Sequence, residues 1–422
     1  MNKQHSLPEL LAPAGDFEKL TYALAYGADA VYFAGKRFGL RAKSTNFDDE
    51  QLKKAIAYTH EKGKKAYITV NVFARNDDIK ALPGYLSFLN DLKPDGLLIS
   101  DPGVFSLAQK YAPDISIHIS TQANNVNYAS ADFWQRLGAS RIVLGRELSL
   151  EEIREIRLKT DMELELFCHG AMCMSYSGRC LLSNFLTGKD ANRGECTHPC
   201  RWEYALTEAS RPGQYFPIEE DEHGSYIMNS KDLNLLPLLP QLTEMGIDSL
   251  KIEGRIKSLY YVAVVVSVYR KALDCLKNNP EIFAEMLPCW QQQLSSVSHR
   301  EYTLGFLKGA LTGEDHRYHS TGYERGYDFI GIVTDAREES SVVQDNMIYV
   351  EQRNHFALGE DIEFMTPEGD IIPYKLQKML DEENSEITVA PHAQMKVKLP
   401  SAFLPDNNTI IPPMSIMRRK VL

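Results

Sequence analysis

One short stretch of this 422-residue chain, residues 167–202, contains five of its seven cysteines. Four of them, Cys173, Cys180, Cys196 and Cys200, are separated by six, fifteen and three residues. Four thiolates can bind zinc or a [4Fe–4S] cluster, but zinc sites usually pair their cysteines roughly two to four residues apart. Only Cys196 and Cys200 fit that spacing. We therefore expect these four cysteines to hold a [4Fe–4S] cluster, with zinc as the alternative.

The remaining cysteines and the neighbouring histidine carry weaker signals. We interpret Cys168, Cys275 and Cys289 as small buried apolar residues. His169 could act as an acid, a base or a ligand, or it could be a hydrogen-bonded residue beside the site. The chain has no H-E-x-x-H motif, no G-x-S-x-G motif and no C-x-x-C redox pair, so the usual hydrolase signatures are missing. A Cys–His nucleophilic pair remains an alternative, although nothing in the sequence singles out one cysteine for this role.

The elements that position these residues follow a regular pattern over the first 275 residues. Short apolar runs alternate with segments of helical periodicity, which predicts parallel strands connected by helices. In the helical segment 148–160, Ser149 is an N-cap candidate with Glu152 three residues later. Eight such units indicate a closed (β/α)8 barrel, with strands expected at 9–15, 30–35, 66–72, 96–103, 116–124, 141–147, 164–170 and 249–255.

We place the barrel at residues 1–300, with an insertion at about 171–232 in its seventh unit. Part of the insertion, residues 202–230, reads as β-strands around turns, and residues 233–246 supply the seventh helix. The insertion leaves the carboxyl end of the seventh strand, which is the catalytic face of such a barrel. The cysteines are therefore expected over the mouth.

Side chains at the carboxyl ends of the other strands should converge on the same mouth. Many are cations, which suits an anionic small molecule or a phosphate-bearing polymer. We expect a catalytic set of His169, Arg146, Lys231, Asp232, Glu253 and Arg255, and a cofactor-binding set of Arg37, Arg41, Lys43, Gln122 and Asn124. Further strand-end candidates are Lys36, Asn71, Arg75, Asp101, Glu147, Lys251 and Lys257.

The sequence pattern changes after residue 300. Residues 301–327 read as a polar linker, and residues 328–422 show the short alternating runs of a small β-barrel domain. The net charge of −11 disfavours general nucleic-acid binding but allows a local basic cleft. No apolar run reaches the roughly eighteen residues that a membrane helix needs, and the amino terminus lacks an apolar signal core. We therefore expect a cytoplasmic protein with no membrane partner.

Five motifs together resemble the U32 family, historically labelled peptidases or collagenases. They are ELFCHGAMCMSYSGRCLLS (165–183), ELLAPAG (9–15), GADAVYFAG (27–35), MNSKDL (228–233) and LKIEGRIKS (250–258). The chain is most similar to the branch implicated in making 5-hydroxyuridine at the wobble position of tRNA, with prephenate as a precursor. Sister branches hydroxylate a ribosomal RNA cytidine or a ubiquinone precursor and carry [4Fe–4S] clusters.

The resemblance also bears on the cluster ligands. Cys173, Cys180 and Cys196 match the family directly, whereas a ubiquinone-type member can place its fourth cysteine where this chain has Asn234. Cys200 is the available fourth thiolate. The hypothesis is thus a tRNA uridine-hydroxylating enzyme with a [4Fe–4S] cluster and prephenate as cosubstrate. The alternatives are a metal- or cysteine-dependent peptidase, or a cluster-bearing RNA-binding partner without activity.

Overall fold

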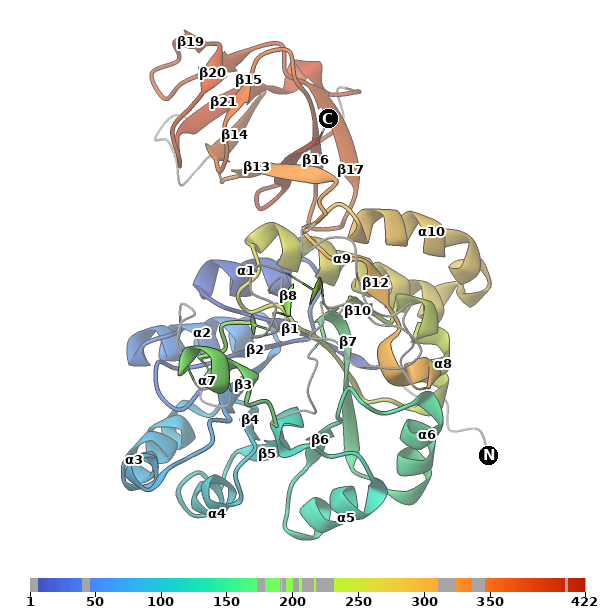
Figure 1. The fold of residues 1–422 in the computed structure, drawn as a ribbon. Coiled ribbons are helices and arrows are strands. Elements are labelled where there is room, and N and C mark those ends of the chain that lie inside the picture. Colours follow the sequence, from blue (N-terminus) through green and yellow to red (C-terminus); the bar gives the residue numbers. More distant parts are fainter. Residues whose placement is uncertain are drawn as a thin grey trace.

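Eight parallel strands close into a barrel, which confirms the predicted fold (Figure 1). The computed structural model describes residues 7–39, 46–172, 179–189, 191, 195–199, 205–206, 216–217, 231–309, 324–335, 346–406 and 409–421. Neighbouring strands pair in chain order, and the last one pairs with both the seventh and the first, which closes the ring. The strands are β1 (Glu9–Pro13), β2 (Ala30–Phe33), β3 (Lys65–Val70), β4 (Gly96–Ile99), β5 (Ser116–Ile119), β6 (Arg141–Val143), β7 (Glu163–Ala171) and β11 (Ser249–Ile252).

Most helices of the barrel, among them α1, α2, α4, α5, α6 and α9, begin at residues whose side chains cap them. Asp48 and Gln51 form a capping box at the start of α2, and Ser149 and Glu152 form the predicted one at the start of α6. In each, two backbone N–H groups that a helix start leaves without partners are satisfied. The helices are α1 (Phe17–Ala25), α2 (Asp49–Glu61), α3 (Asn76–Leu92), α4 (Pro102–Tyr111), α5 (Tyr128–Arg136), α6 (Leu150–Lys159), α8 (Leu239–Met245), α9 (Leu259–Asn278) and α10 (Phe283–Leu294). None of the helices in the described ranges could span a membrane.

The insertion begins after β7 and returns to it. Its described parts are α7 (Leu182–Thr187), the two-stranded pair of β8 (Ala205–Leu206) and β9 (Phe216–Pro217), and β10 (Asp232–Asn234). β10 runs antiparallel to the end of β7 and parallel to β12 (Tyr302–Thr303). β12 thus extends the barrel sheet into the start of the range 301–327, which was predicted as a linker.

The carboxyl-terminal domain is a curled antiparallel sheet of eight strands. Its order is β17-β16-β22-β13-β14-β21-β18-β19, and within the described residues no pairing joins β17 to β19. The strands are β13 (Tyr327–Val333), β14 (Met347–Gln352), β16 (Asp361–Met365), β17 (Ile371–Lys375), β18 (Met379–Leu380), β19 (Glu386–Ile387), β21 (Lys396–Pro400) and β22 (Ile416–Lys420), and β15 (Phe356–Ala357) pairs separately with β20 (Val389–Ala390).

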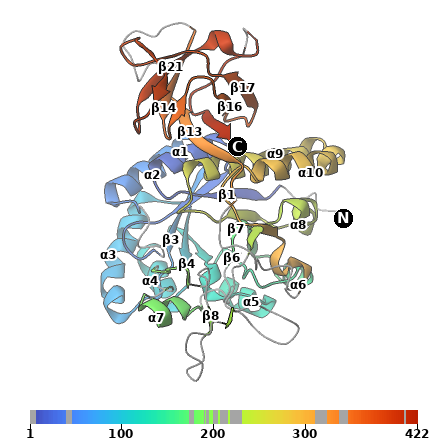
Figure 2. The same ribbon diagram turned by 45° about the horizontal axis from the view of Figure 1, so that its top comes forward.

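This domain packs against α1 and α9 of the barrel (Figure 2). The hydroxyl group of Tyr26 lies 2.9 Å from the carbonyl oxygen of Met365 and 3.0 Å from that of Met414. Arg418 is 4% exposed, and its Nη1 donates to the hydroxyl oxygen of Tyr260 on α9 at 3.2 Å. Ile332, Met365 and Ile416 belong to the same hydrophobic core as the barrel residues. The interface is therefore an extension of the core.

The hydroxyl group of Tyr26 can be tested as an inter-domain anchor. Removing it in Tyr26→Phe leaves two buried carbonyl oxygens without this donor, so we expect the free energy of unfolding to fall by about 1–2 kcal/mol. Urea denaturation followed by tryptophan fluorescence measures the change. Tyr58→Phe is the matched control, since Tyr58 is half-buried against Phe17. Equal stability of Tyr26→Phe and wild type would contradict the assignment.

Candidate active site at the mouth of the barrel

A layer of paired charges fills the barrel interior toward the amino ends of its strands. Nη1 of Arg141 lies 2.7 Å from Oε1 of Glu9 and 3.2 Å from Oε2 of Glu165. Nζ of Lys251 lies 2.8 Å from Oε1 of Glu165. Burial lowers the pKa of Lys251, and its carboxylate partner opposes that shift. Nε of Arg141 also lies 2.8 Å from Oε2 of Glu163. Two cations and three carboxylates thus pair with one another below the mouth.

Lys251 was predicted to lie at the mouth, whereas Glu9, Arg141 and Glu165 of the same layer were not predicted. The signal for them was present, because Glu163 and Glu165 alternate with apolar residues in a strand that is otherwise a buried run. Alternate residues of a barrel strand point inward. Charges at alternate positions of two neighbouring strands therefore indicate an internal ion-pair layer.

Arg255 lies above this layer, where β11 ends, and it is only 5% exposed. Its Nη1 donates to Oγ1 of Thr69 on β3 at 3.3 Å, and its Nη2 to Oδ1 of Asn46 at 2.9 Å. Gly15, after β1, allows the backbone to pass here, since a Cβ at this position would lie 2.1 Å from the carbonyl oxygen of Arg255. Three strand ends thus hold one buried guanidinium group, and Thr69 and Asn46 are contacts that sequence reasoning missed.

Arg146 and Glu253 also meet at the mouth, as predicted from their positions after β6 and β11. Nη2 of Arg146 lies 3.6 Å from Oε2 of Glu253, and its Nη1 donates to the carbonyl oxygen of Ala171 at 3.2 Å. The guanidinium carbon lies 3.9 Å from the ring centroid of Phe167. This contact fixes the plane of the guanidinium group, and the sequence analysis did not anticipate Phe167.

Polar side chains after β3 and β5 provide further hydrogen-bonding groups. Nδ2 of Asn71 lies 3.4 Å from Oγ of Ser120, which also accepts from the backbone N–H of Gln122. Asn124 has a left-handed backbone, with φ of 54°. Within the described part of the chain, no hydrogen-bond partner reaches its buried Nδ2. Buried donors are normally satisfied, so this amide is available to a bound acceptor.

Several predicted residues lie elsewhere. Arg37 is half-exposed and pairs with Asp49 at the start of α2, at 2.8 Å. Lys231 pairs with Glu301 at 3.0 Å. Asp101 caps α4 through the N–H groups of Gly103 and Val104. Of the other strand-end candidates, Lys36 pairs with Asp48, and Nζ of Lys257 donates to the carbonyl oxygen of Ser298 at 3.1 Å. Glu147 is half-buried, Arg75 is exposed at the start of α3, and Arg41 and Lys43 lie outside the described residues.

His169 faces away from the mouth, into the space between β7 and α9. It is 1% exposed, and its ring centroid lies 5.6 Å from that of Tyr269 and 5.2 Å from that of Tyr302. Asp232 lies on β10, which pairs with β7 at this point, and its Oδ2 accepts from the N–H of Arg300 at 3.3 Å. Burial lowers the pKa of His169 to about 3, so the imidazole is neutral near pH 7.

Two of the four predicted ligand cysteines, Cys180 and Cys196, are described, and both are partly exposed. The backbone N–H of Thr197 donates to Oγ of Ser183 at 3.2 Å, which places the segment of Cys196 beside the helix that follows Cys180. The N–H of His198 lies 3.4 Å from Sγ of Cys196, and such bonds stabilise a thiolate ligand. Cys173 and Cys200 lie outside the described residues, and the described ones alone form no metal-binding group.

The other cysteines separate into two kinds. Cys168 is fully buried, and burial raises the pKa of its thiol. It therefore behaves as the apolar strand residue that was predicted. Cys275 is partly exposed and Cys289 is exposed, so the interpretation of these two as buried residues was wrong.

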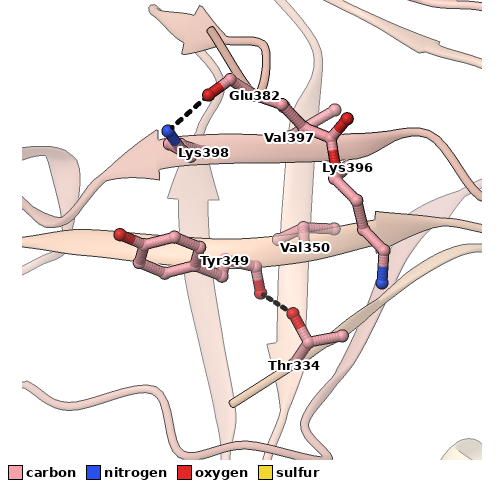
Figure 3. A pocket seen from close by; sticks show the side chains of 7 residues that line it. All are labelled: Thr334, Tyr349, Val350, Glu382, Lys396, Val397 and Lys398. Carbon is pink, nitrogen blue, oxygen red and sulfur yellow. Dashed lines mark hydrogen bonds between the residues drawn. The ribbon is translucent and has the colours of Figure 1, made fainter. Parts of the chain in front are cut away.

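Two hollows lie away from the mouth. One of about 630 Å³ between α6 and α8 is lined by charges of both signs and adjoins the residues before β7 and β11, at the amino ends of the strands. The other, of about 70 Å³, lies in the carboxyl-terminal domain against β14 and β21 (Figure 3). Its lysines are already engaged, Lys396 with Glu351 and Lys398 with the carbonyl oxygen of Glu382. Neither matches the catalytic end of a barrel.

Comparisons with known proteins cover both domains. Residues 15–317 match the family model for peptidase family U32, and residues 325–418 match that for its C-terminal domain. The chain is 39% identical to tRNA hydroxylation protein P1 of Bacillus subtilis strain 168, over 95% of this chain and 94% of the relative. It is 40% identical to tRNA hydroxylation protein P of Escherichia coli strain K12, over 93% of each. The 23S rRNA 5-hydroxycytidine C2501 synthase of Escherichia coli is 35% identical over 64% of this chain and 39% of that protein.

The lowered pKa of His169 has a consequence for stability. The pKa falls from 6.5 to about 3 on folding, so between these values the unfolded chain binds the proton more tightly. The free energy of unfolding should therefore rise with pH across this window, by at most about 1.4 kcal/mol per pH unit from this residue, and level off above it.

Replacing the imidazole should flatten this dependence. We expect the urea midpoint of His169→Gln to vary less than that of wild type as the pH is lowered through the same window. His355→Gln, at an exposed histidine of the carboxyl-terminal domain, is the matched control for loss of one histidine. Identical pH dependence of His169→Gln and wild type would show that His169 is not the group responsible.

Proposed function

The chain belongs to peptidase family U32, and from this premise we propose that it is an enzyme that takes part in 5-hydroxylation of the wobble uridine of tRNA. The observation that carries the proposal is the full-length similarity to relatives named for tRNA hydroxylation, which extends over at least 93% of this chain and of each relative. Because both the barrel and the curled sheet are matched, the proposal concerns the whole protein.

The hydrogen-bond donors at the mouth of the barrel support this proposal, because they suit an anionic cosubstrate. Arg146 follows β6, whereas Glu253 and Arg255 follow β11. Glu253 contacts Arg146, and Arg255 donates to Thr69 on β3. Guanidinium groups bind carboxylates in fixed, planar geometry. We propose that these arginines, together with the amide of Asn124, bind a small dicarboxylate, with prephenate as this cosubstrate. Nearly buried arginines hold such an anion with little competition from water.

We further propose that Cys173, Cys180, Cys196 and Cys200 hold a [4Fe–4S] cluster above this site, with zinc as the alternative metal. When bound, such a cluster would supply an iron or redox centre for handling the oxygen donor. The chain's own contribution is to place Cys180 and Cys196 on adjacent segments, fixed by the bond between Thr197 and Ser183. The N–H of His198 also lies within hydrogen-bond distance of Sγ of Cys196, and hydrogen bonds to cluster sulfurs tune the reduction potential.

The cluster can be tested on protein purified without oxygen. We expect a brown sample with about four irons per chain, and loss of both colour and iron in Cys180→Ala and Cys196→Ala. Cys289→Ala is the matched control, because Cys289 is exposed on α10 and lies outside the insertion. A colourless sample that contains zinc, with the zinc lost in the same variants, would replace the cluster by the zinc alternative.

The activity can be tested by complementation. In a strain that lacks its own tRNA hydroxylation protein, we expect the chain to restore 5-hydroxyuridine, measured by mass spectrometry of tRNA nucleosides. Arg255→Lys keeps the charge but loses the planar donor pair, so the level should fall about tenfold or more. Arg154→Lys is the matched control, at an exposed arginine of the opposite end of the barrel.

The same experiment separates the alternatives. Restoration by Arg255→Lys at the wild-type level would favour a partner role without activity in this mouth. Cleavage of gelatin by the purified protein, together with no restoration of 5-hydroxyuridine, would favour a peptidase. Thermal unfolding of each variant shows whether a loss reflects folding, since Arg255 is nearly buried.

A further inference from the structure

The outer side of α7 exposes large apolar side chains. Phe185 is 85% exposed, and Leu181, directly before the helix, is 70% exposed. These two residues are four positions apart and therefore lie on the same face. The helix belongs to the insertion that leaves the carboxyl end of β7, and Figure 1 draws it in front of the barrel strands. An apolar surface thus lies on the side of the molecule where the insertion begins.

The polar side of α7 is its buried side. Ser183 is 0% exposed, and its Oγ accepts from the N–H of Thr197 and lies 3.1 Å from Oγ1 of the same residue. Oγ1 of Thr187 lies 3.2 Å from Oγ1 of Thr197. Surface helices of globular proteins normally bury their apolar side. Here hydrogen bonds hold the helix so that its apolar side faces outward, which is the arrangement of a surface that binds a partner.

Two cations flank this apolar face. Arg179 and Lys189 are both exposed, one before and one after α7, and neither has an ion pair or hydrogen bond to a side chain of the described chain. Several other cations of the strand ends and insertion are paired, such as Arg37 with Asp49 and Lys231 with Glu301. Two unpaired cations beside an exposed aromatic ring stand out in a chain of net charge −11.

This combination matches single-stranded nucleic acid. Unpaired bases stack on exposed aromatic rings, and flanking cations hold the phosphates on either side. A double helix would offer α7 only phosphates, because its bases are stacked on one another. An apolar protein surface would fit Leu181 and Phe185 but would leave both cations without a partner.

We propose that the outer face of α7 binds an unpaired loop of the RNA substrate, with Phe185 and Leu181 against the bases and Arg179 and Lys189 on the flanking phosphates. This inference rests on the proposed function and assigns the surface that presents the loop to the mouth. Cys180 directly precedes Leu181, so a loop bound here lies beside one of the proposed cluster ligands.

The stacking contact can be tested with the full-length protein and a labelled anticodon stem–loop made from unmodified nucleotides. We expect Phe185→Ala to weaken binding of the stem–loop about tenfold, and Phe185→Trp to bind like wild type because it keeps an aromatic surface. All three proteins should bind the same stem without its loop equally. Phe133→Ala is the matched control, since Phe133 is also exposed, at 50%, on α5.

The phosphate contacts have a separate readout. Each phosphate contact to a single strand contributes about 0.7 to the slope of log affinity against log salt concentration. The double variant Arg179→Ala/Lys189→Ala should therefore lower this slope by about 1.4 for the stem–loop. Arg154→Ala, at the opposite end of the barrel, should leave the slope unchanged.

The results of these experiments distinguish the assignment of the α7 surface from the proposed function in tRNA hydroxylation. Wild-type binding of the stem–loop by Phe185→Ala, or equal weakening by Phe133→Ala, would overturn the assignment of α7, even if the chain restores 5-hydroxyuridine. Selective weakening by Phe185→Ala with no restoration of 5-hydroxyuridine by wild type would uphold the surface and overturn the proposed function. Thermal unfolding checks each variant, and the exposure of Phe185 predicts an unchanged midpoint.

Discussion

The barrel depends on a balance of charge in its interior. Arg141 and Lys251 are nearly buried, and such cations are tolerated in a core only when carboxylates pair with them. Glu9 and Glu165 provide that pairing and connect β1, β6, β7 and β11. The ring closes where β11 meets β7 and β1, so the same charges that fill the core also bridge its closure. The donor side chains at the mouth, those of Arg146 and Arg255, lie above this layer of ion pairs. Their positions depend on the strands that the ion pairs connect.

Much of this architecture could be predicted from the sequence. The eight strands were visible as apolar runs because parallel strands with helices outside are buried on both faces. The meeting of Arg146 with Glu253 followed from topology alone, since carboxyl ends of barrel strands converge. The short β10 and β12 were not foreseen, because three and two residues carry no periodicity that could distinguish them from a loop.

The orientation of His169 shows a different limit. Alternation along β7 would point it inward with Glu165 and Phe167, but the register against β11 shifts here, so that Phe167 faces Lys251 and His169 faces Ile252. The extra residue, Cys168, turns the following side chain outward, as a β-bulge does. In the sequence, the one sign of this irregularity is the glycine at position 170. Its φ of 107° is an angle that glycine adopts readily. Arg37 was misplaced for a simpler reason, because no local pattern predicts that Asp49 pairs with it.

The core that continues from the barrel into the curled sheet constrains how this protein can evolve. Ile332, Met365 and Ile416 pack into the barrel core across the boundary between the two family models. A recombination event that joined this barrel to the sheet of a distant relative would place unmatched side chains against α1 and α9 and leave voids or clashes there. The surfaces of α1, α9 and β22 therefore have to be inherited as a set.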